Sequence, residues 1–135
     1  MAFFEKQDLG RVYVLKMELP DETVIHKVGM CKTSRSTDRM MEILRSWFNS
    51  YRYVPYTELK LDQETGHPEK LEKHIHNILS ENRFIPEHKV SGGTEMFTGI
   101  DEIRLLHYIR NCENVRLPAE MSSEEYKIIS KLVTH

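Results

Sequence analysis

The chain has 135 residues, the size of one ordinary domain, so we expect a single hydrophobic core. Hydrophobic residues make up 39% and charged residues 30% of it, which excludes a disordered or low-complexity protein. The net charge of −2 excludes a protein whose whole surface binds a polyanion.

Neither a membrane segment nor a secretory signal is evident in the sequence. No run approaches the roughly 18 apolar residues that a membrane span requires, and acidic residues stand in the N-terminal region where a signal peptide is apolar. The two cysteines lack CxxC spacing, so neither a disulfide framework nor a zinc ribbon is indicated. We therefore expect a cytoplasmic protein without a membrane partner.

The first half of the chain predicts a β-hairpin followed by a helix. Residues 11–17 and 24–30 are rich in β-forming residues, and the turn sequence PDET lies between them. A loop leads to a helix that Ser36 or Thr37 can cap. The apolar positions that recur at helical spacing, and that we expect to be buried, are Met40, Leu44, Trp47 and Phe48.

The second half predicts two further strands and three helices. Residues 51–61 indicate a third strand, which Pro55 places at an edge or a bulge. A helix from Pro68 to about Ser80, a short strand within 91–99 and a helix over 101–111 follow, and a capping box at Ser122 predicts a last helix. The expected fold is α/β, of the α+β kind, with a small mixed or antiparallel sheet flanked by helices. We expect one domain over residues 1–112 and a helical extension over 113–135.

The predicted hairpin brings two reactive side chains together. Tyr13 and Lys27 lie near the middles of strands that a short turn would pair, so they can share a face of the sheet. Gly29 lies on the same face as Lys27 and leaves room for a ligand or a second backbone. A strand tyrosine alone is usually a packing residue, so its role depends on what surrounds it.

Five short segments carry a resemblance to a known family. They are VYVL around Tyr13, HKVGM around Lys27, Arg39 in the first helix, LEKHIHNIL around Glu72, and TEMF at 94–97. In this order and spacing, over about residues 10–105, they resemble the GIY-YIG nuclease superfamily, and most closely its compact branch in phages and bacteria. The resemblance implies a GIY-YIG-like fold and a metal-dependent DNA endonuclease that hydrolyses phosphodiester bonds with one metal ion.

The resemblance also implies roles for the hairpin and the first helix. Tyr13 would be the general base toward the attacking water, although the unperturbed pKa of tyrosine is about 10. Lys27 stands where better-known members have a second tyrosine, and it would tune Tyr13, hold the water or contact phosphate; we favour tuning. Arg39 would neutralise charge in the transition state. The gap between Gly29 and Arg39 is longer than is usual in the family, which makes Arg35 a rival.

A carboxylate on the second helix is the predicted metal ligand. Glu72 matches the metal-binding glutamate of the family and would hold Mg²⁺ or Mn²⁺. His76 lies one turn further and shares its face, as a second metal contact, a hydrogen-bond partner or a general acid. His74 is about 200° from His76 around the helix, so a zinc site is not favoured. Glu95, in the TEMF segment, is expected to pair with Arg39 or Lys27.

The stretch from His26 to Arg45 is the most basic part of the chain. It carries a net charge of +3 inside an acidic sequence, although from charge alone a solvated helix face beside a basic loop is the more ordinary explanation. The expected partner is double-stranded DNA, contacted by Lys32, Arg35 and Arg45. Because basic residues are few, we expect a homodimer or a targeting partner to add affinity.

Two other functions stay open. One is a nucleic-acid-binding module that keeps the fold and has lost cleavage, and the other is a protein-interaction domain that uses its last helix. If the chain is phage-encoded, its site of action would be the cytoplasm of the bacterial host.

Overall fold

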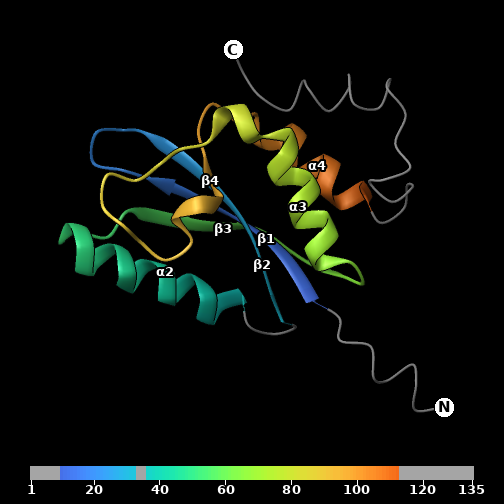
Figure 1. Ribbon diagram of the computed structural model, residues 1–135, viewed down its shortest axis with the longest axis horizontal. Coiled ribbons are helices and arrows are strands. Elements are labelled where there is room, and N and C mark those ends of the chain that lie inside the picture. Colours follow the sequence, from blue (N-terminus) through green and yellow to red (C-terminus); the bar gives the residue numbers. More distant parts are fainter. Residues whose placement is uncertain (1–9, 33–35, 113–135) are drawn as a thin grey trace.

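A computed structural model describes residues 10–32 and 36–112 (Figure 1). Within this part of the chain, four strands form one antiparallel sheet in the order β3-β1-β2-β4. Three helices flank it, so the predicted α+β fold is confirmed. The strands are β1 (Gly10–Glu18), β2 (Val24–Lys32), β3 (Tyr56–Thr65) and β4 (Met96–Phe97); the helices are α2 (Ser36–Tyr51), α3 (Pro68–Ile78) and α4 (Glu102–Cys112), with short 3-10 turns η1 (Ser80–Asn82) and η2 (Gly93–Glu95).

The sheet separates two layers of helices. Figure 1 shows α2 on one side of the sheet and α3 with α4 on the other. Alternation along β1 divides the core accordingly: Val12 and Val14 pack with α3 and α4, whereas Tyr13 and Leu15 pack with Ile43 and Trp47 of α2. Odd-numbered residues of β1 therefore face α2.

The hairpin register confirms that Tyr13 and Lys27 share a face. Tyr13 lies opposite Gly29, and Leu15 lies opposite Lys27. Because directly opposite residues of an antiparallel pair point to the same side, all four side-chain positions face α2.

The third strand begins later than predicted. The sequence analysis placed a strand from residue 51, but α2 runs through Tyr51 and β3 begins at Tyr56. The Tyr51 ring stacks on Trp47 at 4.8 Å between centroids, and Arg52, with φ 63°, closes the helix by donating its backbone N–H to the Phe48 carbonyl. This stacking between residues four apart in the same helix thus overrides the β-propensity of the aromatic stretch, and Pro55 precedes the strand.

The buried face of α2 is also rotated from the predicted one. Ile43 and Trp47 are buried, whereas Phe48 is 46% exposed and Met41 is 42% exposed. The expectation that Phe48 belongs to the core was therefore wrong, since the Ile43–Trp47–Tyr51 row, at intervals of four residues, turns Phe48 away from the sheet.

The edge strand β3 contains a bulge. Val14 pairs with Leu61 and Leu15 with Leu59, so Lys60 has no opposite residue on β1. The Lys60 ammonium lies 2.7 Å from the Glu58 carboxylate. This extra residue interrupts the regular ladder of β3.

The helix predicted after Ser122, and with it the extension over 113–135, lies outside the described residues. In the described part, no helix is long and apolar enough to cross a lipid bilayer.

Candidate functional site

Tyr13 stands at the centre of a buried polar cluster between the sheet and α2. Its side chain is fully shielded from solvent. Its hydroxyl makes no hydrogen bond of regular geometry with the described residues, although the Arg39 guanidinium lies near enough to act on it. A Cβ atom added at Gly29 would lie 2.5 Å from the Tyr13 hydroxyl and 3.0 Å from the Lys27 ammonium. Only glycine fits opposite Tyr13, because a side chain there would occupy the space of both groups.

Lys27 is held in place by the segment around η2. Its ammonium is completely buried, lies 5.4 Å from the centroid of the Tyr13 ring, and forms an ion pair with the Glu95 carboxylate. A Cβ atom added at Gly92, whose φ is 72°, would lie 2.6 Å from the lysine Cε. Burial lowers the Lys27 pKa, and the Glu95 charge opposes that shift. The segment therefore both covers the lysine and supplies its counter-charge.

Arg39 enters the cluster from α2. Its guanidinium donates to the Glu42 carboxylate at 2.9 Å and to the Ser91 hydroxyl at 3.1 Å. The Ser91 backbone N–H in turn donates to the Ser46 hydroxyl of α2 at 2.8 Å. These contacts fasten the segment before η2 to α2, so Arg39 and Lys27 are positioned by the same six-residue stretch, 90–95.

Glu72 and His76 come from α3, which lies along the edge of β2. The short strand β4 pairs with β2 only at His26 and Lys27. Beyond that point His76 Nε2 donates to the Val28 carbonyl at 2.7 Å, and Glu72 accepts a backbone hydrogen bond from Met30. The two side chains, four residues apart on one helix face, therefore satisfy edge groups of β2 that no strand pairs.

The surroundings of the Glu72 carboxylate disfavour its ionised form. Burial raises its pKa to about 7; the nearby Glu95 charge adds to the shift, and the Lys27 charge opposes it. Its Oε2 atom is buried and lacks a hydrogen-bond partner in the described part of the chain. A divalent cation would stabilise the ionised carboxylate by its positive charge, and it would also give Oε2 a partner. No group of three or more His, Cys, Asp or Glu residues suited to a metal occurs among the described residues, so substrate and water oxygens would complete such a site.

The electrostatics of Tyr13 differ from the expectation. Burial raises the pKa of its hydroxyl, whereas the Arg39 charge lowers it and the Glu95 charge raises it further. Arg39, rather than the Glu95-paired Lys27, thus supplies the main positive charge acting on Tyr13. With burial outweighing Arg39, the hydroxyl is protonated at neutral pH in this arrangement.

The structure brings most of the predicted site residues together. Side chains from both hairpin strands, α2 and α3 converge, and these are Tyr13, Lys27, Arg39, Glu72 and His76. Arg45, a predicted DNA contact, instead lines a hollow on the outer face of α2 with Met41 and Phe48. Arg35 and the side chain of Lys32 lie outside the described residues.

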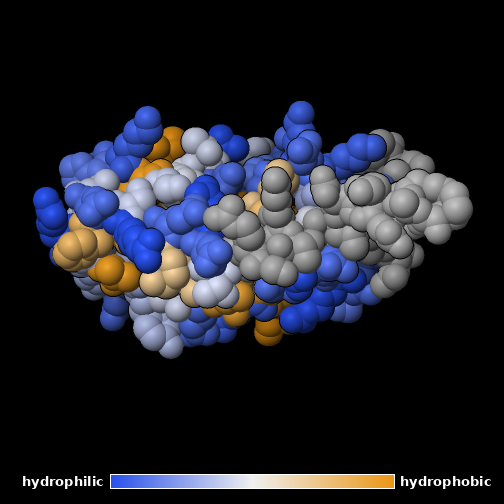
Figure 2. Space-filling model, turned by 90° about the horizontal axis from the view of Figure 1, so that it is seen from below, coloured by the Kyte–Doolittle hydropathy of each residue, from blue (hydrophilic) through white to orange (hydrophobic). Residues whose placement is uncertain are grey.

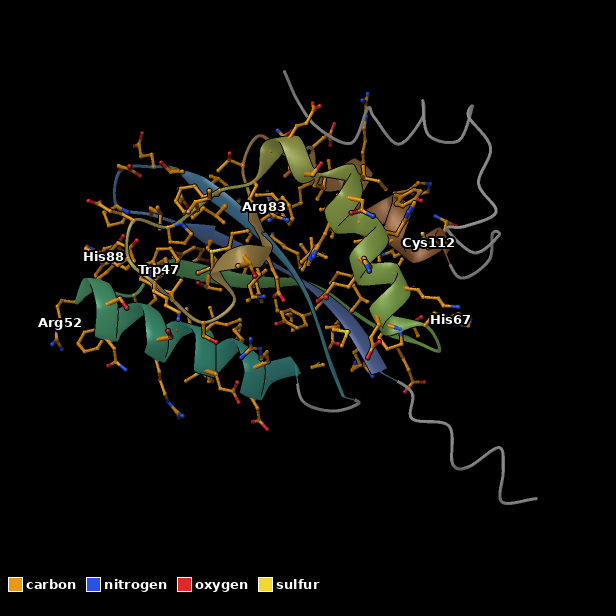
Figure 3. The ribbon with its side chains drawn as sticks, viewed as in Figure 1. Trp47, Arg52, His67, Arg83, His88 and Cys112 are labelled. Atoms are coloured by element: carbon orange, nitrogen blue, oxygen red, sulfur yellow. The ribbon has the colours of Figure 1, made fainter. Side chains whose placement is uncertain are left out.

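Three residues near the cluster were not predicted from the sequence. Ser91 and Gly92 lie in the segment SGGTEMF, for which the sequence predicted a short strand but not the contacts with α2 and Lys27. Arg83 pairs with Phe97 through an isolated bridge and lies beside β4 (Figure 3). It is exposed, makes no ion pair within the described part, and its charge lowers the pKa of His76.

A comparison with family models identifies the domain. The model of the T5orf172 domain matches residues 10–114. This is a different family from the GIY-YIG nucleases, for which no model matches, so the family assignment made from the short segments was wrong. T5orf172 domains are nuclease-like, DNA-binding domains, which gives the chain a nucleic-acid-related function. No curated protein and no solved structure matches the chain.

Proposed function

The chain belongs to the T5orf172 domain family, and on that premise we propose that it is a DNA endonuclease that hydrolyses phosphodiester bonds with one divalent cation. The observation that carries the proposal is that Tyr13 and Glu72 both lie within electrostatic reach of the Lys27–Glu95 pair. Each also has a buried oxygen without a hydrogen bond of regular geometry among the described residues. Buried polar atoms are nearly always satisfied, so each exception calls for an explanation, such as a catalytic role or a bound ion.

Tyr13 is the proposed general base. Its hydroxyl oxygen would take the proton of the attacking water, which requires a pKa well below the value that burial imposes. Arg39 already favours the ionised form, and its guanidinium is also suited to a phosphate oxygen. Arg39 would thus favour the ionised form of Tyr13 and also stabilise the negative charge that develops on the phosphate.

Glu72 is the proposed ligand of Mg²⁺ or Mn²⁺. Magnesium keeps much of its hydration and is often held by one or two carboxylates, so Glu72 needs few protein partners. When bound, the cation would polarise the phosphate and stabilise the leaving oxygen. His76 is committed to the Val28 carbonyl through Nε2, which supports a positioning role for it beside Glu72.

Double-stranded DNA is the proposed substrate. Arg39 enters the cluster from α2, and Arg83 lies beside β4, where its charge acts on His76. Two arginines that approach the cluster from different elements suit contacts with successive phosphates of a DNA strand. Because Tyr13 and Lys27 are fully shielded, the proposal requires the 90–95 segment, which covers Lys27, to shift when DNA binds.

The test is incubation of the purified chain with supercoiled plasmid, with Mg²⁺ or with EDTA. We expect nicking or linearisation only with Mg²⁺, and its loss in Glu72→Gln. Glu81→Gln, which changes an exposed carboxylate of η1, is the matched control and should cut like the parent. A parent protein that binds plasmid in a gel shift but never cuts it would refute the endonuclease.

Complete burial of Tyr13 and Lys27 favours one second candidate. A DNA-binding domain without cleavage needs no access to these groups, which would then only stabilise the fold. In that case Tyr13→Phe would leave DNA binding unchanged and Arg83→Ala would weaken it. Neither variant would cut DNA.

A further inference from the structure

The outer face of α2 carries a row of exposed side chains unrelated to the buried cluster. They follow one another at intervals of three or four residues, which places the first four on one face of α2; the fifth directly follows the helix. All are exposed, and they are Asp38, Met41, Arg45, Phe48 and Arg52. We call this row the outer stripe.

The centre of the outer stripe is apolar and hollowed. Met41, Phe48 and Val54 are 42%, 46% and 52% exposed, and with Leu44 they line a hollow of about 300 Å³. Figure 2, which views the molecule from the side where α2 lies, shows hydrophobic side chains breaking an otherwise hydrophilic surface. An apolar hollow among charged groups is typical of a surface that another protein covers.

Charge changes sign along the outer stripe. Asp38 lies near the N-terminal end of α2, whereas Arg45 lies in its C-terminal half and Arg52 directly follows it. Figure 3 shows Arg52 at that far end of the helix. A surface with opposite charges at its two ends and an apolar middle is complementary to itself after a two-fold rotation.

We propose that the outer stripe is the contact between two copies of this chain, with the two α2 helices antiparallel. The end of each helix that carries Asp38 then lies along the half of the other that carries Arg45, and Asp38 lies near the partner's Arg52. Apolar side chains around Met41 and Phe48 fill the two hollows, and the antiparallel helix dipoles attract. Arg39 reaches toward the sheet from the opposite border of α2, so both buried clusters stay outside the contact.

A second copy explains the stripe better than DNA does. A DNA-binding face needs positive charge along its whole length, whereas Asp38 and two exposed apolar side chains interrupt this one. The inference is independent of cleavage, since none of these residues belongs to the proposed catalytic machinery.

Charge reversal tests the arrangement. Analytical ultracentrifugation of the full chain should show a concentration-dependent dimer. In a dimer of Asp38→Arg, residues 38 and 52 would form two contacts between arginines. In a dimer of Arg52→Asp, they would form two contacts between aspartates. Each substitution should therefore weaken the dimer about tenfold or more. An equimolar mixture of the two variants should restore the parent affinity, because every pair is then opposite in charge. Aspartate tolerates the positive φ of residue 52, so this variant should fold.

A second pair of variants tests the apolar centre. Phe48→Glu should give a monomer at all concentrations, whereas Ile103→Glu, which changes an 80% exposed apolar residue of α4, should dimerise like the parent. A parent chain that is monomeric throughout, or a mixture that does not recover, would overturn the proposal. Loss of DNA binding in Phe48→Glu with no change in mass would assign the stripe to DNA instead.

Discussion

Lys27 and Glu95 form an ion pair across 68 positions of the sequence, and the lysine side of the pair is fully buried. Removal of one partner from such a pair leaves an uncompensated charge inside the protein. We expect Glu95→Gln to lower the free energy of unfolding by about 3 kcal/mol, as measured by urea denaturation. The double variant Lys27→Met with Glu95→Gln removes both charges and should recover most of that loss. If Glu95→Gln alone unfolds like the parent, the pair contributes nothing to stability.

Gly29→Ala should damage the site through its shape alone. The added methyl group would lie 2.5 Å from the Tyr13 hydroxyl, so the ring and Lys27 must move. We expect a loss of about 1 to 3 kcal/mol in stability, together with a sharp fall in plasmid cleavage. Gly66→Ala is the matched control, because nothing lies within 4 Å of the added atom. If Gly29→Ala were as stable and as active as Gly66→Ala, Tyr13 would accommodate the added methyl group with no loss of stability or cleavage.

Tyr13→Phe should separate stability from activity. The hydroxyl is buried without a hydrogen bond of regular geometry, so its removal should leave the melting temperature unchanged or raise it. If this oxygen is the base, plasmid cleavage should fall by about a hundredfold or more. A variant that melts lower and cuts normally would show that the hydroxyl serves the fold and not the chemistry.

Glu72 should make the stability of the metal-free protein depend on pH. Burial raises its pKa to about 7 in the native state, so the native state retains a proton that the unfolded chain has already released. Stability therefore falls as pH rises from about the unfolded value of 4.5 through 7, by about 1 to 3 kcal/mol after allowance for partial exposure.

Chemical denaturation in EDTA at several pH values measures this dependence. Glu72→Gln should make the free energy of unfolding less dependent on pH, and the variant should be more stable than the parent at pH 8. Glu81→Gln should show the same pH dependence as the parent. Addition of Mg²⁺ at pH 8 should stabilise the parent and not Glu72→Gln. An unchanged slope in Glu72→Gln would place the titrating group elsewhere.

Arg83 should contribute one phosphate contact. Gel shifts in EDTA at several salt concentrations should show that Arg83→Ala weakens DNA binding and reduces the slope of log K against log salt by about one. Arg110→Ala, an exposed arginine of α4, should leave the slope unchanged. Identical slopes for Arg83→Ala and the parent would remove Arg83 from the DNA path.

Local patterns were enough to predict the hairpin and its shared face. Strand alternation placed Tyr13, Lys27 and Gly29 on one side, and the register confirms it. The end of α2 was missed because stacking of Tyr51 on Trp47 and closure at Arg52 outweigh local propensity. The exposure of Phe48 was missed because a helix with several apolar residues offers more than one stripe, and only the sheet decides which is buried.

The sequence predicted that these residues lie close together, but not the hydrogen bonds that join them. Sequence spacing brought His76 to the face of Glu72, yet its contact with the Val28 carbonyl depends on how far β4 extends along β2. The contact between Ser91 and Arg39 joins residues 52 positions apart, which no local pattern reports. The short segments also suggested the wrong family, since a tyrosine and a lysine on a hairpin do not identify one.

The bulge at Lys60 has a consequence for the protein in concentrated solution. An exposed edge strand of ten residues is a template on which partly unfolded neighbours can add their own strands. The extra residue breaks the regular spacing of hydrogen-bonding groups midway along β3, and a docking strand would also have to desolvate the Lys60 ammonium and its Glu58 partner. The edge of this sheet is thereby protected against fibril growth, by one inserted residue and one ion pair.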